Sequence, residues 1–348
     1  MNAMGAPPDT EAKLRFLEGT LTPHHGGEPA RRLETHMSWL LLGGEQVLKL
    51  KKPVRHPFLD FTTVQARERN SREELRLNRR LAPRIYLHLL ALQWDGRDFA
   101  LVREEDLPAP GDTVDWLVVM QRLPAERMLD QMIARGSLVP HDEDALLDVL
   151  VPFYRRAPHP DIGEDEYLGR LRAELAEDRR VLALPRFALP QIDALLDRMD
   201  HALATHEGLL RRRARERRLV EGHGDLRPEH VCLIDPPVVI DALEFDARLR
   251  EVDPFDELCF LGLECAMVGD AELGPRLTAR CADALDDHPG PALLRWHTAY
   301  RALLRARLSA AHLLDDEVRT PEKWLPRAQH YLMRAGAALD ELDGHPAR

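Results

Sequence analysis

Short apolar runs in the first third of this 348-residue chain have the length and spacing of β-strands. They are followed by polar or turn-forming residues, and they lie at Leu33–Leu42, Gln46–Leu50, Ile85–Leu92, Phe99–Val102 and Trp116–Met120. The pair Gly43-Gly44 between the first two runs favours a β-hairpin. Apolar residues at helical spacing predict a short helix over Glu11–Gly19 and a longer one over Thr62–Leu81, which Pro83 ends.

After Leu123 the spacing of apolar residues becomes mostly helical. Helices are expected over Met128–Ala134, Asp142–Arg155, Glu164–Leu182 and Leu189–Arg213, and again from Pro254 onward with breaks at Pro289 and Pro321. Two short strands, Leu219-Val220 and Val238–Ile240, interrupt this helical region. The pattern predicts an α+β fold with two lobes. Residues 1–121 would form a small lobe of mixed β-sheet, and residues 122–348 a larger, mostly helical lobe.

Composition narrows the class of protein. The chain is 44% hydrophobic and 31% charged, which is typical of a globular protein, and no apolar run approaches the ~18 residues of a membrane span. Its formal net charge of -11 argues against a general nucleic-acid binder. The four cysteines show no Cys-x-x-Cys spacing, and the N-terminus does not resemble a signal peptide. We therefore expect a cytoplasmic protein that binds neither membrane nor nucleic acid.

The most informative motif is His223-Gly224-Asp225, which follows an apolar strand, together with Asp241 at the end of the next strand. A carboxylate on a rigid turn suits a general base, and a carboxylate at a strand end suits Mg²⁺. Phosphoryl transfer needs both, because its chemistry is mostly positioning and charge neutralisation. The alternatives are an ordinary His-Gly-Asp turn and a loop of solvated acids that also includes Glu244 and Asp246.

Lys49 is a cation within the apolar strand Val47–Leu50. Such a lysine could contact nucleotide phosphates and pair with a glutamate of the following helix. Lys51 competes for this role because it shares the same strand face, whereas Lys52 points the other way. Glu74 fits the apolar side of the helix better than Glu73. The alternative is that Lys49–Lys52 is simply a basic strand end.

Several sequence blocks, in the right order, resemble the aminoglycoside phosphotransferase family, which has the protein-kinase-like fold. They are Glu34–Trp39, Lys49–Val54, Phe58–Phe61, Glu73–Pro83, Val220–Val231 and Asp241–Asp256. The resemblance covers the chain from Glu34 to Ala310 and is greatest to the branch often fused ahead of a P-loop ATP-binding domain.

The resemblance implies ATP-dependent phosphorylation of a small-molecule hydroxyl group, as in a sugar, aminoglycoside or amino alcohol, with Mg²⁺ or Mn²⁺. The implied catalytic residues are Asp225, His223 and Arg227. The implied nucleotide-binding residues are Lys49 and Glu74, the phosphate-loop residues Thr35, His36 and Ser38, and the hinge residues Met120, Gln121 and Leu123. Asp241 and His230 would hold the metal, and Asp256 would support the catalytic loop.

The sequence departs from the family pattern in three places. His230 stands where the family has a metal-binding Asn, and imidazole is a softer ligand than an amide oxygen. Neither a Gly-x-Gly-x-x-Gly loop nor a P-loop motif occurs in the sequence. A nucleotide-binding pseudokinase or regulatory module, a protein kinase, and an enzyme with a separate P-loop partner protein therefore stay open.

Arg301 and Arg305 share one face of a late helix. They are expected either to contact a phosphate or to pair with acids of neighbouring helices.

Overall fold

The computed structural model describes residues 8–21, 29–56, 59–315, 318 and 320–344, so Phe58 of the family-like blocks lies outside the described residues. Its internal contacts divide the chain into two compact units. The first unit comprises Met1–Met128 and His230–Ala247, and the second comprises Leu129–Glu229 and Arg248–Arg348. The predicted lobe boundary at residues 121/122 stays a prediction.

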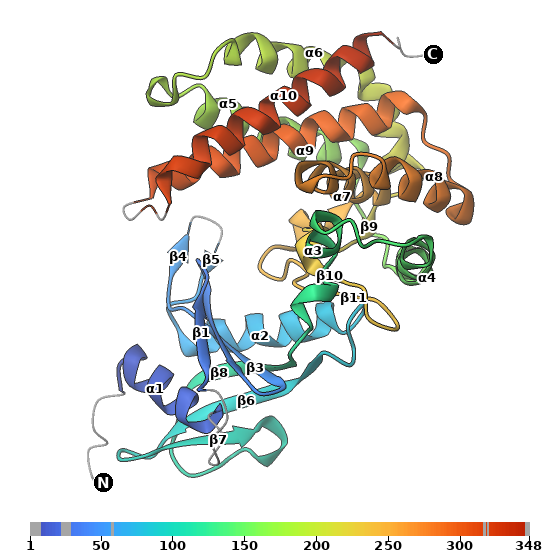
Figure 1. The fold of residues 1–348 in the computed structure, drawn as a ribbon. Helices are drawn as coiled ribbons and strands as arrows, with labels where there is room; N and C mark the ends of the chain where they lie inside the picture. The colour runs from blue at the N-terminus through green and yellow to red at the C-terminus, as the bar shows by residue number, and fades with distance from the viewer. Residues whose placement is uncertain (1–7, 22–28, 57–58, 316–317, 319, 345–348) are drawn as a thin grey trace. The chain divides into compact units, whose positions relative to one another are not determined.

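The first unit is built around a six-stranded antiparallel sheet (Figure 1). Along the sheet the strands follow the order β1-β2-β3-β8-β6-β7. The elements of this unit are α1 (Thr10–Leu21), β1 (Arg31–Glu34), β2 (Ser38–Gly43), β3 (Gln46–Lys51), β4 (Arg55–His56), β5 (Leu59–Asp60), α2 (Val64–Asn78), β6 (Tyr86–Trp94), β7 (Phe99–Arg103), β8 (Asp112–Gln121), β10 (Val231–Cys232) and β11 (Val238–Val239).

Side chains along the central strands alternate between two apolar cores, one on each face of the sheet. On β8, Leu117 and Val119 join the core that contains Leu14 and Leu17 of α1. Residues of the other parity, such as Val118, join a core that α2 helps to cover. This alternation places every second residue of β3 on the α2 side, and Lys49 and Lys51 share that parity with Val47.

The predicted hairpin at Gly43-Gly44 is confirmed, because β2 pairs antiparallel with β3 in the register Gly43↔Gln46. The expected strand Leu33–Leu42 was wrong in one respect, since a turn at residues 35–37 divides it into β1 and β2. Thr35 causes the break, because its hydroxyl oxygen accepts a hydrogen bond from the Ser38 N–H at 3.0 Å and closes the turn. The helix expected over Thr62–Leu81 is confirmed as α2.

Residues 230–247 belong to the first unit although they are distant from it in sequence. The short hairpin of β10 and β11 contributes Cys232 and Val238 to the core on the α2 face of the sheet. A β-bridge between Met128 and Cys232 fixes its position. The segment that contains Asp241 is thereby held against the same core as α2.

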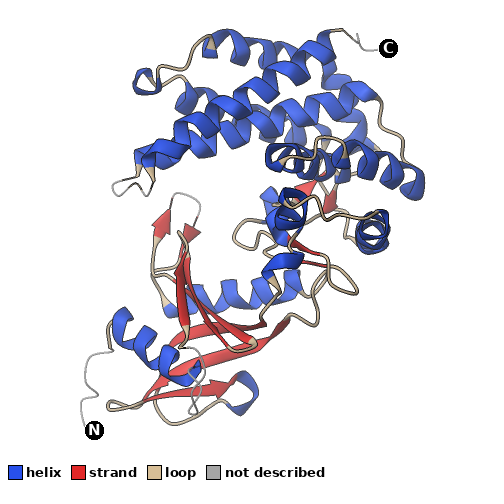
Figure 2. Cartoon of the chain, viewed as in Figure 1, coloured by secondary structure: helices blue, strands red, loops and turns tan. Residues whose placement is uncertain are grey.

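The second unit is mostly helical, with one short strand pair (Figure 2). Its elements are α3 (Leu129–Ala134), α4 (Pro140–Arg156), α5 (Glu164–Leu182), α6 (Ile192–Arg215), β9 (Val220–Glu221), β12 (Glu251–Val252), α7 (Pro254–Val268), α8 (Leu273–Leu285), α9 (Pro291–Ala311) and α10 (Trp324–Asp343). The fully buried Trp296 lies in an apolar core shared by α5, α6, α9 and α10. Among the described residues, no helix is both long enough and apolar enough to cross a lipid bilayer.

Helices α7 and α8 approach each other closely through a pair of glycines. A Cβ atom added to Gly274 would lie 2.3 Å from the Cα atom of Gly262, and one added to Gly262 would lie 2.9 Å from the Cα atom of Gly274. Because the opposing atoms belong to the backbone, a side chain can be accommodated only if a helix moves. Two glycines are therefore required for this helix contact.

Replacing Gly274 by Ala should lower the free energy of unfolding by about 1–3 kcal/mol, the usual cost of overpacking. The control is Gly169→Ala in α5, where an added Cβ atom meets nothing within 4 Å. That substitution should raise the free energy of unfolding by up to about 1 kcal/mol through helix propensity. Urea unfolding measures both changes, and effects of the same sign would contradict the proposed backbone contact.

Candidate functional site

A fully buried carboxylate, that of Glu74, organises the candidate site in the first unit. Lys49 and Lys51 of β3 both reach it from the neighbouring sheet: the Lys49 Nζ atom lies 2.7 Å from Oε1, and the Lys51 Nζ atom lies 2.5 Å from Oε2. Glu73 points away from the sheet side of α2 and pairs with Arg76 near the surface. The strand thus presents two cations to one acid.

The electrostatic surroundings favour the charged forms of Glu74 and Lys49. Burial alone would raise the pKa of Glu74, but the ammonium groups of Lys49 and Lys51 outweigh burial and lower it. Burial alone would likewise lower the pKa of Lys49, but the carboxylates of Asp241 and Glu74 raise it well above its ordinary value. The ion pair between Lys49 and Glu74 therefore persists over the whole physiological pH range.

The segment that follows β11 brings two further acids to the same lysines. The Asp241 Oδ1 atom lies 2.9 Å from Lys49 Nζ, and the Glu244 Oε1 atom lies 2.8 Å from Lys51 Nζ. Two backbone hydrogen bonds hold this segment: the Asp241 N–H donates to the Tyr86 hydroxyl at 3.2 Å, and the Ala242 N–H donates to Asn78 Oδ1 at 2.9 Å.

Asp241 itself adopts a left-handed backbone conformation with φ of 62°. This conformation is costly for a residue other than glycine, so it persists only where the surroundings enforce it. The two backbone hydrogen bonds enforce it, together with the ion pair between Lys49 and Asp241 and the ion pair between Lys51 and Glu244. The Asp241 carboxylate is about half exposed, which leaves it accessible to a ligand.

The net charge around Asp241 suits a hard cation, but the side chains there supply fewer ligands than such a cation needs. Three carboxylates face two ammonium groups, which leaves one net negative charge for a cation to balance. His230 lies beside Asp241, with 3.7 Å between Nε2 and Oδ2. Within the described part of the chain, these two residues do not join a third ligand in a preformed metal cluster. Water or other oxygen ligands would complete the coordination of a Mg²⁺ ion held at Asp241.

The predicted phosphate-loop and hinge residues lie elsewhere in the first unit. Thr35 and Ser38 form the turn between β1 and β2 through their own hydrogen bonds. At the predicted hinge, Met120 and Gln121 end β8, and the N–H groups of Gln121 and Arg122 donate to the carbonyls of Ile85 and Glu45. The N–H groups of these two residues are therefore already paired within the first unit.

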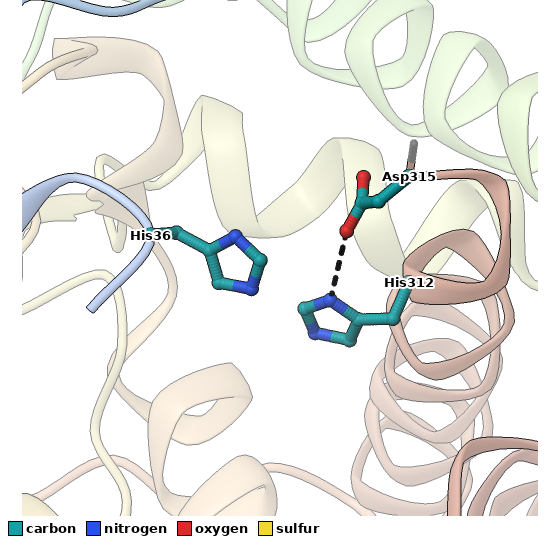
Figure 3. Close-up of side chains that lie close together, drawn as sticks. All are labelled: His36, His312 and Asp315. Carbon is teal, nitrogen blue, oxygen red and sulfur yellow. Dashed lines mark ion pairs between the residues drawn. The ribbon is translucent and has the colours of Figure 1, made fainter. Parts of the chain in front are cut away.

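His36, the third predicted phosphate-loop residue, is an exposed residue of the turn between β1 and β2. Figure 3 draws it with His312 and Asp315, whose Nδ1 and Oδ2 atoms form an ion pair at 3.6 Å. His36 belongs to the first unit and the other two residues belong to the second, so the three together do not define a metal site.

The three catalytic candidates, His223, Asp225 and Arg227, lie together in the second unit. The Asp225 N–H donates to His223 Nδ1 at 3.2 Å, and Arg227 forms an ion pair of 2.8 Å with the Asp225 carboxylate. Arg227 also pairs with Glu229. The Asp225 carboxylate is partly exposed, so its turn presents an oriented acid to solvent.

Glu257 of α7 holds this turn from beneath. One of its carboxylate oxygens accepts hydrogen bonds from the N–H groups of His223 and Gly224, and the other accepts one from the Tyr154 hydroxyl at 3.0 Å. Gly224 has φ of 87°, and a Cβ atom at Gly222 would lie 2.7 Å from the Glu257 carboxylate. Both glycines are therefore required where the turn closes over Glu257. Burial raises the pKa of Glu257, and the hydrogen bond from the Gly224 N–H is the largest effect that opposes this.

The expectation that Asp256 supports the catalytic loop was wrong by one residue. Asp256 instead forms a buried, bidentate ion pair with Arg301 at 2.6–2.7 Å. Arg305 similarly pairs with Glu264 of α7 at 2.7 Å. Of the two alternatives for these arginines, pairing with acids of a neighbouring helix is confirmed. Helical spacing alone does not distinguish Asp256 from Glu257, because both face neighbouring helices.

Comparisons with known proteins place the fold. No protein-family model matches the sequence. Uncharacterized proteins of Mycobacterium tuberculosis and Mycobacterium bovis are each 29% identical over 324 residues, which is 90% of this chain. The chain spans 62% of the length of these relatives.

Two of the solved structures that are similar to this chain are the following. The GDP and kanamycin complex of APH(2″)-IIia has a TM-score of 0.51 at 14% identity, with 95% of this chain and 98% of that chain covered. A choline/ethanolamine kinase family protein from Mesorhizobium loti also has a TM-score of 0.51 at 14% identity, with 95% of this chain and 99% of that chain covered. At this identity the likeness concerns the fold alone. It confirms the predicted α+β, two-lobed, protein-kinase-like fold.

Replacing Glu257 by Ala should lower the free energy of unfolding by about 2–6 kcal/mol, because it leaves two buried N–H donors unpaired at about 1–3 kcal/mol each. Glu257→Gln is the matched control, since its amide oxygen can still accept from both donors and its NH₂ group can donate to Tyr154. Urea unfolding and amide hydrogen exchange at residues 223 and 224 measure the difference. Equal losses in the two variants would show that the hydrogen bonds to the turn contribute little.

Proposed function

We propose that this protein transfers the γ-phosphoryl group of ATP to a hydroxyl group of a small molecule, with Mg²⁺ or Mn²⁺ held by Asp241. The observation that carries the proposal is the ion-paired group of Lys49, Glu74 and Asp241 in the first unit. It combines a fixed cation for nucleotide phosphates with an accessible carboxylate for a metal ion. Phosphoryl transfer depends on this combination of positioning and charge neutralisation.

Lys49 is suited to bind phosphates because one of its two acidic partners, Asp241, can be replaced by a ligand. Glu74, one partner of Lys49, is fully buried and cannot be displaced by a ligand. Asp241, the other partner, is partly exposed, so a ligand can take its place. A nucleotide with its metal would take over the interaction between Lys49 and Asp241: the phosphates would bind the lysine, and the metal would bind the carboxylate. Glu74 would keep the lysine oriented throughout.

Asp225 is proposed to orient the acceptor hydroxyl and to receive its proton. A base for this step must be held in place and must remain accessible. The Asp225 carboxylate meets both requirements, because Glu257 fixes its turn and the carboxylate itself is partly exposed. His223 and Arg227 orient this group through the backbone and the carboxylate respectively.

The names of the fold neighbours support the proposed class of acceptor. One of them is a complex with kanamycin and the other is a choline/ethanolamine kinase family protein. We therefore propose a small acceptor that carries a hydroxyl group, such as a sugar, an aminoglycoside or an amino alcohol. We also propose that a separate P-loop protein is a partner of this chain. The proposed location is the cytoplasm.

His230 favours a second candidate function, that of a nucleotide-binding module without turnover. Its ring lies beside Asp241 and offers a nitrogen where an oxygen ligand would suit Mg²⁺ better. Such a module would bind ATP or ADP, yet it would release no ADP from ATP with either metal in the presence of any acceptor. Nucleotide binding combined with the absence of turnover is therefore the result that favours this second function.

The proposed reaction is tested by ADP release from ATP with Mg²⁺ or Mn²⁺ over a panel of sugars, amino alcohols and aminoglycosides. Asp225→Asn should lower kcat by about 100- to 10,000-fold, the usual contribution of a general base. ATP binding should change little, because the substitution leaves the first unit intact. Fluorescent nucleotide titration measures the binding.

The control is Asp193→Asn, at an exposed position in the first turn of α6 in the same unit. It should leave both turnover and binding as in the unmodified protein. Equal losses of ATP binding and turnover in Asp225→Asn would contradict the assignment of Asp225 as the base.

A further inference from the structure

Lys51 is a buried cation that the proposed reaction does not use. Its side chain is 1% exposed, and its Nζ atom lies between the carboxylates of Glu74 and Glu244 and 5.4 Å from the centre of the Phe61 ring. A lysine enclosed in this way cannot reach a ligand without leaving its partners. Its role must therefore be sought in what it connects.

Lys51 connects α2 to the segment 241–244 through two ion pairs. Glu74, on α2, gives one carboxylate oxygen to Lys49 and the other to Lys51, and Lys51 then binds Glu244 at 2.8 Å. The side chain of Glu244 is 11% exposed, whereas that of Asp241 is 47% exposed. The bond to Glu244 is thus the sheltered one of the two ion pairs between β3 and this segment.

The same segment carries the left-handed residue Asp241, the proposed metal ligand. On one side of the segment, the backbone hydrogen bonds to Tyr86 and Asn78 fix residues 241 and 242. On the other side, Glu244 is fixed by Lys51. Asp241 therefore lies within a short stretch that is held at both ends, independently of its own bond to Lys49.

We propose that Lys51 is a positioning residue, which anchors Glu244 to the α2–β3 core and so holds Asp241 in its left-handed conformation before any ligand binds. This inference rests on the proposed function for the role of Asp241. We call the contact between Lys51 and Glu244 the 51–244 anchor. When a nucleotide replaces the bond between Lys49 and Asp241, the 51–244 anchor keeps the segment in place.

The two lysines thus have different tasks although they share a carboxylate. Lys49 is the more exposed of the two and faces the accessible acid, so its bond to Asp241 is suited to exchange. Lys51 is enclosed, so its ion pairs with Glu74 and Glu244 remain in place when a ligand binds. The arrangement avoids the cost of ordering the metal-binding segment at the moment of binding.

The anchor is tested first in the protein free of metal and nucleotide, by amide hydrogen exchange of residues 241–244. Lys51→Met should speed exchange there by about tenfold or more, as expected for local opening, while the rest of the sheet stays protected. The matched control is Lys52→Met. Lys52 is the next residue, and its ion pair with Glu34 and its contact with the Trp39 ring involve neither Glu74 nor residues 241–244. It should leave exchange of these residues unchanged.

The second measurement is the Mg²⁺ dependence of ADP release. Lys51→Met and Glu244→Ala should raise the Mg²⁺ concentration for half-maximal activity by about 10- to 100-fold, the usual effect of losing a residue that orients a metal ligand. KM for the acceptor should not change. Lys51→Arg, which keeps the charge, should restore part of the loss, whereas a merely structural role would shift stability without this selective effect on Mg²⁺.

Unchanged exchange at residues 241–244 in both Lys51→Met and Glu244→Ala would overturn the proposal. So would an unchanged Mg²⁺ dependence in variants that do show faster exchange. Glu244→Ala keeps the test decisive if Lys51→Met does not fold, because it removes the anchor without leaving Lys51 unpaired. An unmodified protein without phosphotransfer activity would count against the proposed function, and the exchange measurement would still decide whether the anchor exists.

Discussion

The structure of the first unit depends on one buried carboxylate shared by two lysines. A single carboxylate cannot neutralise two ammonium groups, so Lys49 and Lys51 each require a second acid, and the segment after β11 supplies Asp241 and Glu244. The two lysines of β3 thereby bind a segment, residues 241–244, that is distant from them in sequence. Removing one member of such a buried group typically costs about 3–5 kcal/mol, because its partners are left as uncompensated charges. This cost makes the arrangement cooperative.

The second unit uses a related principle at the turn that carries Asp225. There too a fully buried acid, Glu257, lies beneath the functional residue and organises it through hydrogen bonds. Its partners are backbone N–H groups and not lysines, so it fixes the chain's path and leaves the Asp225 side chain accessible. In both units, then, a sheltered carboxylate positions an exposed one. This division separates the stability of the site from its chemistry.

The features that could be predicted from sequence are those with local periodicity. The alternation along β3 correctly grouped Lys49 with Lys51, and helical spacing correctly favoured Glu74 over Glu73 for the sheet side of α2. The sequence contains no comparable periodic signal for contacts between residues that are far apart along the chain. The contacts of Asn78 and Tyr86 with the segment at Asp241 join residues more than a hundred positions apart. The prediction named Asp256, and not Glu257, as the support of the catalytic loop for the same reason. These two adjacent buried acids differ only in the distant groups that they contact, which the sequence does not indicate.

The glycine contact between α7 and α8 has a consequence for the evolution of this protein. Glu257 lies on α7, which approaches α8 closely where Gly262 meets Gly274. A bulkier residue at either glycine would push α7 away from α8, and the support of the Asp225 turn would move with α7. Substitutions on α8, a helix without any proposed chemical role, are thus restricted by the geometry of a distant turn. Divergent sequences that keep Glu257 should also keep small residues at this crossing.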